Sequence, residues 1–219
     1  MKKLSKDKIR LRREKAKIIV RKLRKIFPDA KVALNHSNPW ELLVAVILSA
    51  QCTDKKVNEV TKKLFKKYKT LDDYVKADID EFKKDIYQTG FYNAKAKNIL
   101  TSAKMVKEKF GGKVPDTMEE LLGLPGVARK TANIILSSAY GKAEGIAVDT
   151  HVKRLANVLG LSDEKDPNKI EKDLMQIVPR EDWIDFNYLL VNYGRKYCPA
   201  IIHDHAKCPL TKLLNRKII

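Results

Sequence analysis

The stretch Trp40–Ala50 limits the possible folds of this chain more than any other part of its sequence. It follows Asn38 and a proline, a pair that is typical of a helix start. Apart from Glu41 and Ser49 it is apolar on all sides, and such a helix is stable only when other helices surround it. Helical spacing of apolar residues also dominates the rest of the chain, whereas strand alternation is scarce. We therefore expect an all-α fold with this helix in the middle of a bundle.

The charge of the chain points to a polyanionic partner. Its 219 residues include 45 Lys and Arg against 27 Asp and Glu, a formal net charge of +18, far more than solubility needs. Hydrophobic residues make up 44% of the chain, which is enough for a packed core and excludes a disordered basic tail. Charge alone does not distinguish nucleic acid from an acidic protein or a membrane surface. The longest apolar run, Leu42–Leu48, is much shorter than the roughly 20 residues of a membrane span, so we expect no membrane contact.

The cysteines and the N-terminus indicate the cellular compartment of the protein. Cys52, Cys198 and Cys208 are too few to make a disulfide framework, which favours a reduced, intracellular protein. The N-terminus is basic but lacks the uninterrupted apolar segment of a secretory signal. We expect a monomer in the cytoplasm or at the nucleoid.

A Pro-Gly turn in the segment Leu124–Lys130 separates two predicted helices. A turn that leads into a helix leaves backbone N–H groups unpaired at the positive end of the helix dipole. Such groups bind a phosphate without reading base sequence, and the glycine lets the backbone approach it closely. Taken alone, the turn is more typical of an ordinary connection between helices, so its interpretation depends on the residues that follow.

Lys130 lies in the first turn of the second helix, and Asp149 follows 19 residues later. An amine must lose its proton before it attacks carbon, and the positive end of a helix favours the neutral form. A carboxylate can accept that proton or stabilise positive charge that develops on a sugar. Asp149 is equally suited to cap a helix that begins at Thr150. Neither residue is diagnostic alone, but a hairpin, a lysine and an aspartate in this order favour an enzyme that acts on DNA.

These segments resemble a known superfamily. Leu122–Ala139 together with Ala147–His151 resembles the helix-hairpin-helix and Gly/Pro-Asp signature of the HhH-GPD DNA glycosylases. Leu43–Asp54, Gly90–Ala96 and Tyr193–Cys198 are similar to segments of the endonuclease III branch. The resemblance extends over nearly the whole chain.

The resemblance implies two helical domains with a DNA-binding groove between them. A six-helix barrel containing the helix-hairpin-helix would span residues 33–143. The second helical domain would combine residues 1–32 with residues 144–219.

The resemblance also implies an activity: a bifunctional DNA glycosylase and AP lyase that removes oxidised pyrimidines from damaged double-stranded DNA in base excision repair. Lys130 would attack C1′ of an extruded nucleotide, and Asp149 would assist it. The resulting Schiff base would permit β-elimination. Gln51 would fill the space left by the base, Phe91 would wedge the duplex and His151 would border the site. The hairpin would contact DNA through Leu124, Gly126, Ala128 and Arg129.

Some of these positions have simpler interpretations. Without the resemblance, Gln51 is an ordinary polar surface residue and Phe91 a partly buried aromatic. Ala128 stands where the family usually has a second hairpin glycine. Because alanine readily adopts helical angles, we expect little loss of phosphate binding.

The C-terminal region departs further from the family. Relatives of endonuclease III often carry a [4Fe–4S] cluster on the pattern C-x6-C-x2-C-x5-C, and these positions here hold Cys198, His205, Cys208 and Leu214. Because the cluster takes four thiolates and leucine cannot ligate, we predict no such cluster and no cofactor, its place being taken by helical packing. Zinc on Cys198, His203, His205 and Cys208 is a less favoured alternative, since the spacing is compressed.

Three other functions remain open. Thymine or uracil mismatch glycosylases and adenine glycosylases belong to the same superfamily but commonly lack lysine at position 130. The adenine enzymes also carry an extra C-terminal domain, for which this chain is too short. A non-catalytic DNA-binding protein would need the hairpin and the basic surface but neither Lys130 nor Asp149.

Overall fold

The computed structural model describes residues 5–201 and 203–217, and all regular secondary structure within them is helical. The predicted all-α class is therefore confirmed. The chain divides into two compact units. We call Val32–Gly141 the continuous unit, and Met1–Lys31 with Lys142–Ile219 the two-segment unit. No helix in the described ranges is long and apolar enough to span a bilayer.

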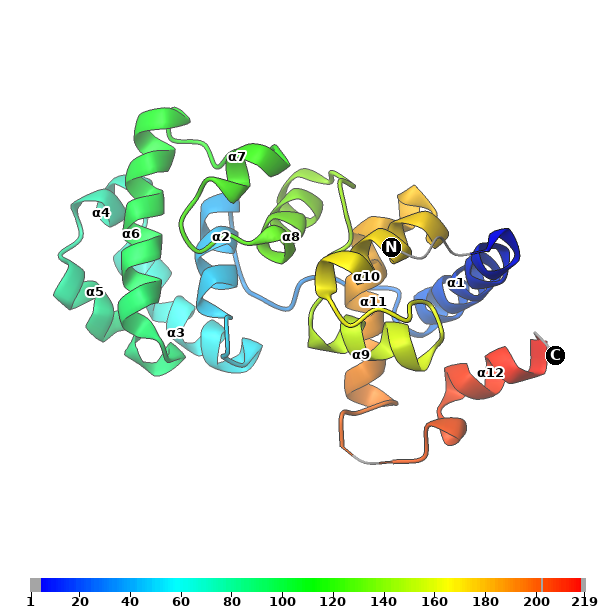
Figure 1. Ribbon diagram of the computed structural model, residues 1–219. Helices are drawn as coiled ribbons and strands as arrows, with labels where there is room; N and C mark the ends of the chain where they lie inside the picture. The colour runs from blue at the N-terminus through cyan, green and yellow to red at the C-terminus, as the bar shows by residue number, and fades with distance from the viewer. Residues whose placement is uncertain (1–4, 202, 218–219) are drawn as a thin grey trace. The chain divides into compact units, whose positions relative to one another are not determined.

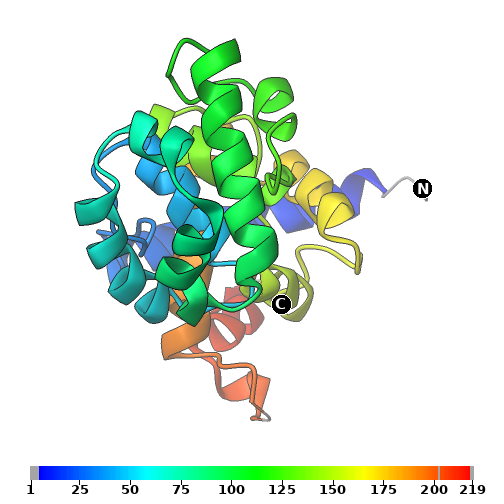
Figure 2. The same cartoon turned by 90° about the vertical axis from the view of Figure 1, so that its left-hand side faces the viewer.

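The continuous unit is built around one apolar helix, α2 (Pro39–Leu48). Trp40 and every residue from Leu42 to Leu48 are buried. Figures 1 and 2 show this helix among its neighbours, and it contacts α3, α6 and α8. Asn38 caps it as expected, since its side chain accepts a hydrogen bond from Glu41 N at 2.9 Å. The other helices of the unit are α3 (Asp54–Lys67), α4 (Leu71–Lys76), α5 (Ile79–Ile86), α6 (Tyr92–Lys109), α7 (Met118–Leu122), α8 (Arg129–Tyr140) and the 3-10 turn η1 (Tyr87–Thr89).

The two-segment unit joins the beginning of the chain to its end around one core. Ile19 and Leu23 of α1 (Lys6–Ile26) belong to the same buried cluster as Leu174, Phe186 and Leu210. As a result α1 contacts α10, α11 and α12. The later helices of this unit are α9 (Thr150–Val158), α10 (Pro167–Ile177), α11 (Trp183–Lys196) and α12 (Pro209–Lys217), with the 3-10 turns η2 (Arg180–Asp182) and η3 (His205–Lys207).

Gly194 lies inside a helix rather than at its end. Glycine is expected to stop a helix, yet α11 continues to Lys196. A Cβ atom at position 194 would lie 2.9 Å from Nδ1 of His151 and 3.2 Å from Cδ1 of Leu155, both on α9. The glycine therefore lets α9 and α11 pack closely and places His151 against the α11 backbone.

Candidate active site and metal site

Side chains of α6 contact the hairpin between α7 and α8 and hold it in place. Gly126 has a φ of 79°, and a Cβ atom there would lie 2.7 Å from Nδ2 of Asn98, so both its conformation and its surroundings require glycine. The hydroxyl of Ser102 donates to the carbonyl of Pro125 at 3.3 Å. Leu124 is buried and anchors the turn, whereas Gly126 is exposed. The structure thus holds the hairpin backbone at the surface in one conformation.

The start of α8 has the properties of an anion site. Its N-cap, Ala128, has an extended backbone (φ −92°, ψ 169°), and no side chain caps the helix. Ala128 therefore does not adopt helical angles. The expectation that alanine is tolerated here because it readily adopts helical angles was wrong in its reason. Its negative φ is nevertheless accessible to alanine, so glycine is not needed for the backbone. The first N–H groups of α8 lack a side-chain cap at the positive end of the helix dipole.

Lys130 is the second residue of α8 and is exposed, while the six residues after it, 131–136, are buried. Among the residues that the structure describes, the side chain of Lys130 forms neither an ion pair nor a hydrogen bond. Its amine is therefore available to a substrate. Arg129, beside it, is half-buried.

Asp149 is held as a helix cap in the two-segment unit. Its Oδ1 accepts a hydrogen bond from Val152 N at 2.8 Å at the start of α9, as predicted. The preceding segment is fixed by the buried Asn187, whose Nδ2 donates to the carbonyl of Ala147 at 2.9 Å. The carboxylate is half-buried and keeps further acceptor positions, because a carboxylate has about four lone-pair sites. His151 follows two residues later and packs on Gly194.

Gln51 and Phe91 share an uncommon backbone conformation. Their φ angles are 53° and 49°, and they are the only non-glycine residues with positive φ in the described chain. Gln51 lies between α2 and α3, and Phe91 is the N-cap of α6 with 65% of its surface exposed. A left-handed residue other than glycine is strained and persists only where the surrounding structure imposes it, often at functional sites.

Lys95 connects the two segments that carry Gln51 and Phe91. Only 4% exposed, it directs Nζ to the carbonyl of Leu48 and to the carbonyl of Thr89, each at 2.8 Å. Burial lowers the pKa of Lys95. Lys95 is inconspicuous in the sequence, because one lysine among 45 basic residues carries no signal of burial. Its position on the same face of α6 as the buried Ile99 is the pattern that could have revealed it.

We expect Lys95→Met to destabilise the protein by about 2–4 kcal/mol, because two buried carbonyls lose a charged donor. Urea unfolding followed by circular dichroism measures the change. Lys97→Met is the matched control on the same helix, where an exposed lysine should alter stability by no more than about 0.5 kcal/mol. Equal stability of the two variants would mean that the hydrogen bonds from Lys95 to the carbonyls of Leu48 and Thr89 do not stabilise the fold.

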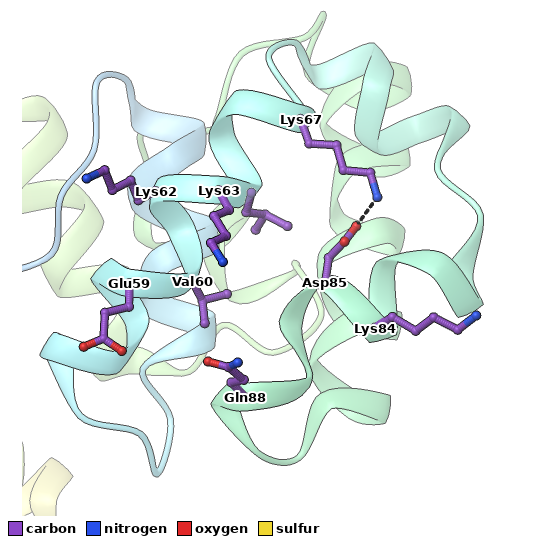
Figure 3. Close-up of a pocket in the computed structure, with 9 residues that line it drawn as sticks. Glu59, Val60, Lys62, Lys63, Lys67, Lys84, Asp85 and Gln88 are labelled. Carbon is purple, nitrogen blue, oxygen red and sulfur yellow. Dashed lines mark hydrogen bonds and ion pairs between the residues drawn. The ribbon is translucent and has the colours of Figure 1, made fainter.

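A cavity of about 580 Å³ between α3 and α5 is a separate feature. None of the predicted site residues lines it. Figure 3 shows Lys62 and Lys84 pointing away from it, while Lys67 turns to Asp85 at 2.6 Å. A hydrogen bond to Asp85 and another to Glu81 raise the pKa of Lys67. Because its lysines do not converge, this cavity offers no site comparable with the hairpin.

The C-terminal region brings two cysteines and two histidines together. One ligand atom from each of Cys198, His203, His205 and Cys208 lies within 4.8 Å of all the others. Sγ of Cys198 is 3.3 Å from Nδ1 of His205, and Sγ of Cys208 is 3.2 Å from Nε2 of His203. Both cysteines are buried, and burial raises the pKa of the Cys208 thiol to about 11. The four side chains can therefore hold a metal.

Comparison with known proteins identifies the family. The family model described as HhH-GPD superfamily base excision DNA repair protein matches residues 44–180. The endonuclease III of Synechocystis sp. is 45% identical over 92% of this chain and 92% of its own length. The endonuclease III of Bacillus subtilis is 49% identical over 88% of this chain and 88% of its own length. The chain belongs to the endonuclease III family. It is a bifunctional base excision repair enzyme, both a DNA glycosylase and an AP lyase.

Solved structures agree with this membership of the endonuclease III family. A non-covalent endonuclease III–DNA complex and a trapped endonuclease III–DNA covalent intermediate each superpose with a TM-score of 0.86 at 42% identity. They cover 94% of this chain, which spans 98% and 99% of theirs. A thermostable thymine-DNA glycosylase is more distant, with a TM-score of 0.79 at 25% identity over 91% of this chain and 95% of its own.

The prediction that this endonuclease III homologue has no cofactor was wrong. The family carries a metal cluster, and Cys198, His203, His205 and Cys208 form a group able to hold a metal here. A metal on these four residues was the less favoured alternative because their spacing is compressed, with His203 and His205 only two positions apart. Their rings instead meet edge to face at 4.3 Å, at the chain turn that begins η3, so both reach the same point.

Proposed function

We propose that this endonuclease III homologue removes oxidised pyrimidines from double-stranded DNA, with Lys130 as the nucleophile and Asp149 as the group that accepts its proton. The observation that carries the proposal is the position of Lys130. It is exposed and free of ion pairs within the described residues, in the first turn of the uncapped helix that follows the hairpin. Two similar structures, an endonuclease III–DNA complex and a trapped covalent intermediate, support chemistry of this kind.

The proposed mechanism begins with binding. The net charge of +18 attracts the phosphate backbone, and the N–H groups around Gly126 and Ala128 bind one phosphate without reading sequence. Leu124 and Arg129 complete the hairpin contacts. Gln51 fills the space from which the damaged base has left, and the exposed ring of Phe91 enters the stack. Extrusion costs a few kcal/mol and least for a damaged base, which contributes to selectivity. His151 borders the site. An enzyme that repairs double-stranded DNA must reach that DNA, which supports a location in the cytoplasm at the nucleoid.

The chemistry then takes two stages. Asp149 accepts a proton from the Lys130 ammonium, and the neutral amine attacks C1′ while the glycosidic bond breaks and its electron pair leaves with the base. The sugar ring opens to a Schiff base between Nζ and C1′. Loss of a proton from C2′ then expels the 3′ phosphate by β-elimination, and hydrolysis of the Schiff base restores the lysine.

A lesion panel tests the substrate assignment. Duplexes containing one thymine glycol, one dihydrouracil, one thymine–guanine mismatch or one uracil–guanine mismatch are incubated with the native protein, and both base release and strand cleavage are measured. We expect the two oxidised pyrimidines to be processed at least about tenfold faster than the mismatches, with cleavage accompanying release. Faster processing of a mismatch would assign the protein to the thymine or uracil enzymes instead. Tight binding without either product would indicate a non-catalytic DNA-binding protein.

A further inference from the structure

We infer that Cys198, His203, His205 and Cys208 bind a single zinc ion in tetrahedral geometry, at the place where the family pattern puts an iron–sulfur cluster. The first support for this inference is the identity of the four donor residues. The fourth cysteine position of the pattern is occupied by Leu214, which is 5% exposed and packs in the core of the two-segment unit. The fourth donor comes instead from His203, which lies outside the pattern.

The spacing of the donors fits one ion. Tetrahedral zinc lies about 2.3 Å from sulfur and about 2.0–2.1 Å from imidazole nitrogen, which separates the ligand atoms by roughly 3.3–3.8 Å. The contacts Cys198–His205 and His203–Cys208 are 3.3 Å and 3.2 Å, and all four donors lie within 4.8 Å of one another. Two thiolates and two imidazoles form an ordinary structural zinc set, whereas a [4Fe–4S] cluster takes four thiolates.

The groups around the donors already hold them in ligating orientations. Nδ1 of His203 is 2.8 Å from the carbonyl of Ile201, so this nitrogen carries the proton and Nε2 presents its lone pair toward Cys208. Zinc-bound histidines usually donate their second ring N–H in this way. The Arg154 guanidinium lies 3.5 Å from Sγ of Cys198 and also donates to the carbonyl of Cys198. Arg154 can therefore stabilise the thiolate that a metal requires.

The site has four protein ligands, so it is closed and its role is structural. It joins the end of α11, which stops two residues before Cys198, to the start of α12, which begins one residue after Cys208. Zinc would therefore fix the chain between these helices, and α12 in turn packs on α1. This role is independent of the reaction at Lys130.

Elemental analysis of the native protein, purified without chelators, is the direct test. We expect one zinc per chain and little iron. Replacement by Co²⁺ should give the visible absorption bands of a tetrahedral thiolate site. Four irons per chain with matching sulfide would overturn the inference in favour of a cluster, and a protein that neither contains nor takes up zinc or Co²⁺ would overturn it outright.

Variants assign the ligands. Cys208→Ser and His203→Asn are expected to lower the bound zinc to below about one tenth of an ion per chain and to remove the stabilisation that zinc gives against heat. Cys52→Ser and His36→Asn are the matched controls, since both residues lie in the continuous unit, and each should retain one zinc. Full zinc in His203→Asn would exclude the proposed ligand set. Even where a variant fails to fold, the amount of zinc per chain in the native protein and the Co²⁺ spectrum decide whether the site binds zinc.

Discussion

The Lys130→Ala variant is expected to form no covalent adduct with damaged DNA under borohydride and to lose strand cleavage by at least about a thousandfold. Borohydride reduces a Schiff base to a stable amine, so trapping reports the bond between Nζ and C1′ directly. Lys130 lies on the exposed side of α8 and has no partner among the described residues, so its removal should leave the fold intact. Gel electrophoresis of the trapped complex and of the cleaved strand measures the effect.

DNA binding separates loss of chemistry from loss of the substrate. The hairpin backbone, held by Ser102 and Asn98, remains in Lys130→Ala, so affinity for an uncleavable abasic-site analogue should fall by less than about tenfold. Lys104→Ala is the matched control, because it removes one exposed lysine from α6 in the same unit. That control should form the adduct at the native rate. A normal yield of adduct in Lys130→Ala would assign the nucleophile to another amine.

Asp149→Asn is expected to slow base release by about a hundred- to ten-thousandfold while leaving the protein folded. Asparagine caps a helix as well as aspartate does, so the hydrogen bond from Val152 N should survive the substitution. What it removes is the negative charge and the ability to accept a proton. Single-turnover measurement of base release, with enzyme in excess over lesion DNA, reports this step.

The control for Asp149→Asn is the same substitution at another cap of the same unit. Asp166 caps α10 by accepting from Lys169 N at 3.0 Å. Asp166→Asn should therefore match Asp149→Asn in thermal stability but release the base at the native rate. If both variants release it at the native rate, Asp149 acts only as a cap.

The parts of this molecule that depend on local rules could be predicted from sequence. The central helix α2 follows from a run of apolar residues, its start from Asn38, and the α9 cap from Asp149, because each depends on neighbours within four residues. The hairpin was likewise identified by its Pro-Gly turn. The ψ of 169°, which makes Ala128 an extended cap, is a detail that this pattern does not specify.

Features made by distant residues could not be predicted in the same way. The Lys95 contacts join Leu48 to Thr89. The four candidate metal ligands could be named from the sequence, but their convergence on one point depends on the chain turn between His203 and Cys208. Gly194 has its role because α9 passes close by. In each case the determining contact is tertiary, and periodicity along one helix does not contain it. The standard cysteine spacing was misleading because it does not include His203, which joins Cys198, His205 and Cys208 in the group able to hold a metal.

Because both ends of the chain belong to one core, the two units fold in a fixed order during synthesis on the ribosome. The continuous unit, Val32–Gly141, contains all of its own helices and can fold as soon as it leaves the exit tunnel. By contrast, Ile19 and Leu23 of α1 are synthesised early but find their partners on α10, α11 and α12 only when translation is almost complete. A nascent chain whose residues up to Gly141 have left the tunnel thus presents a folded continuous unit preceded by an amphipathic helix without its packing partners, a segment that chaperones can bind.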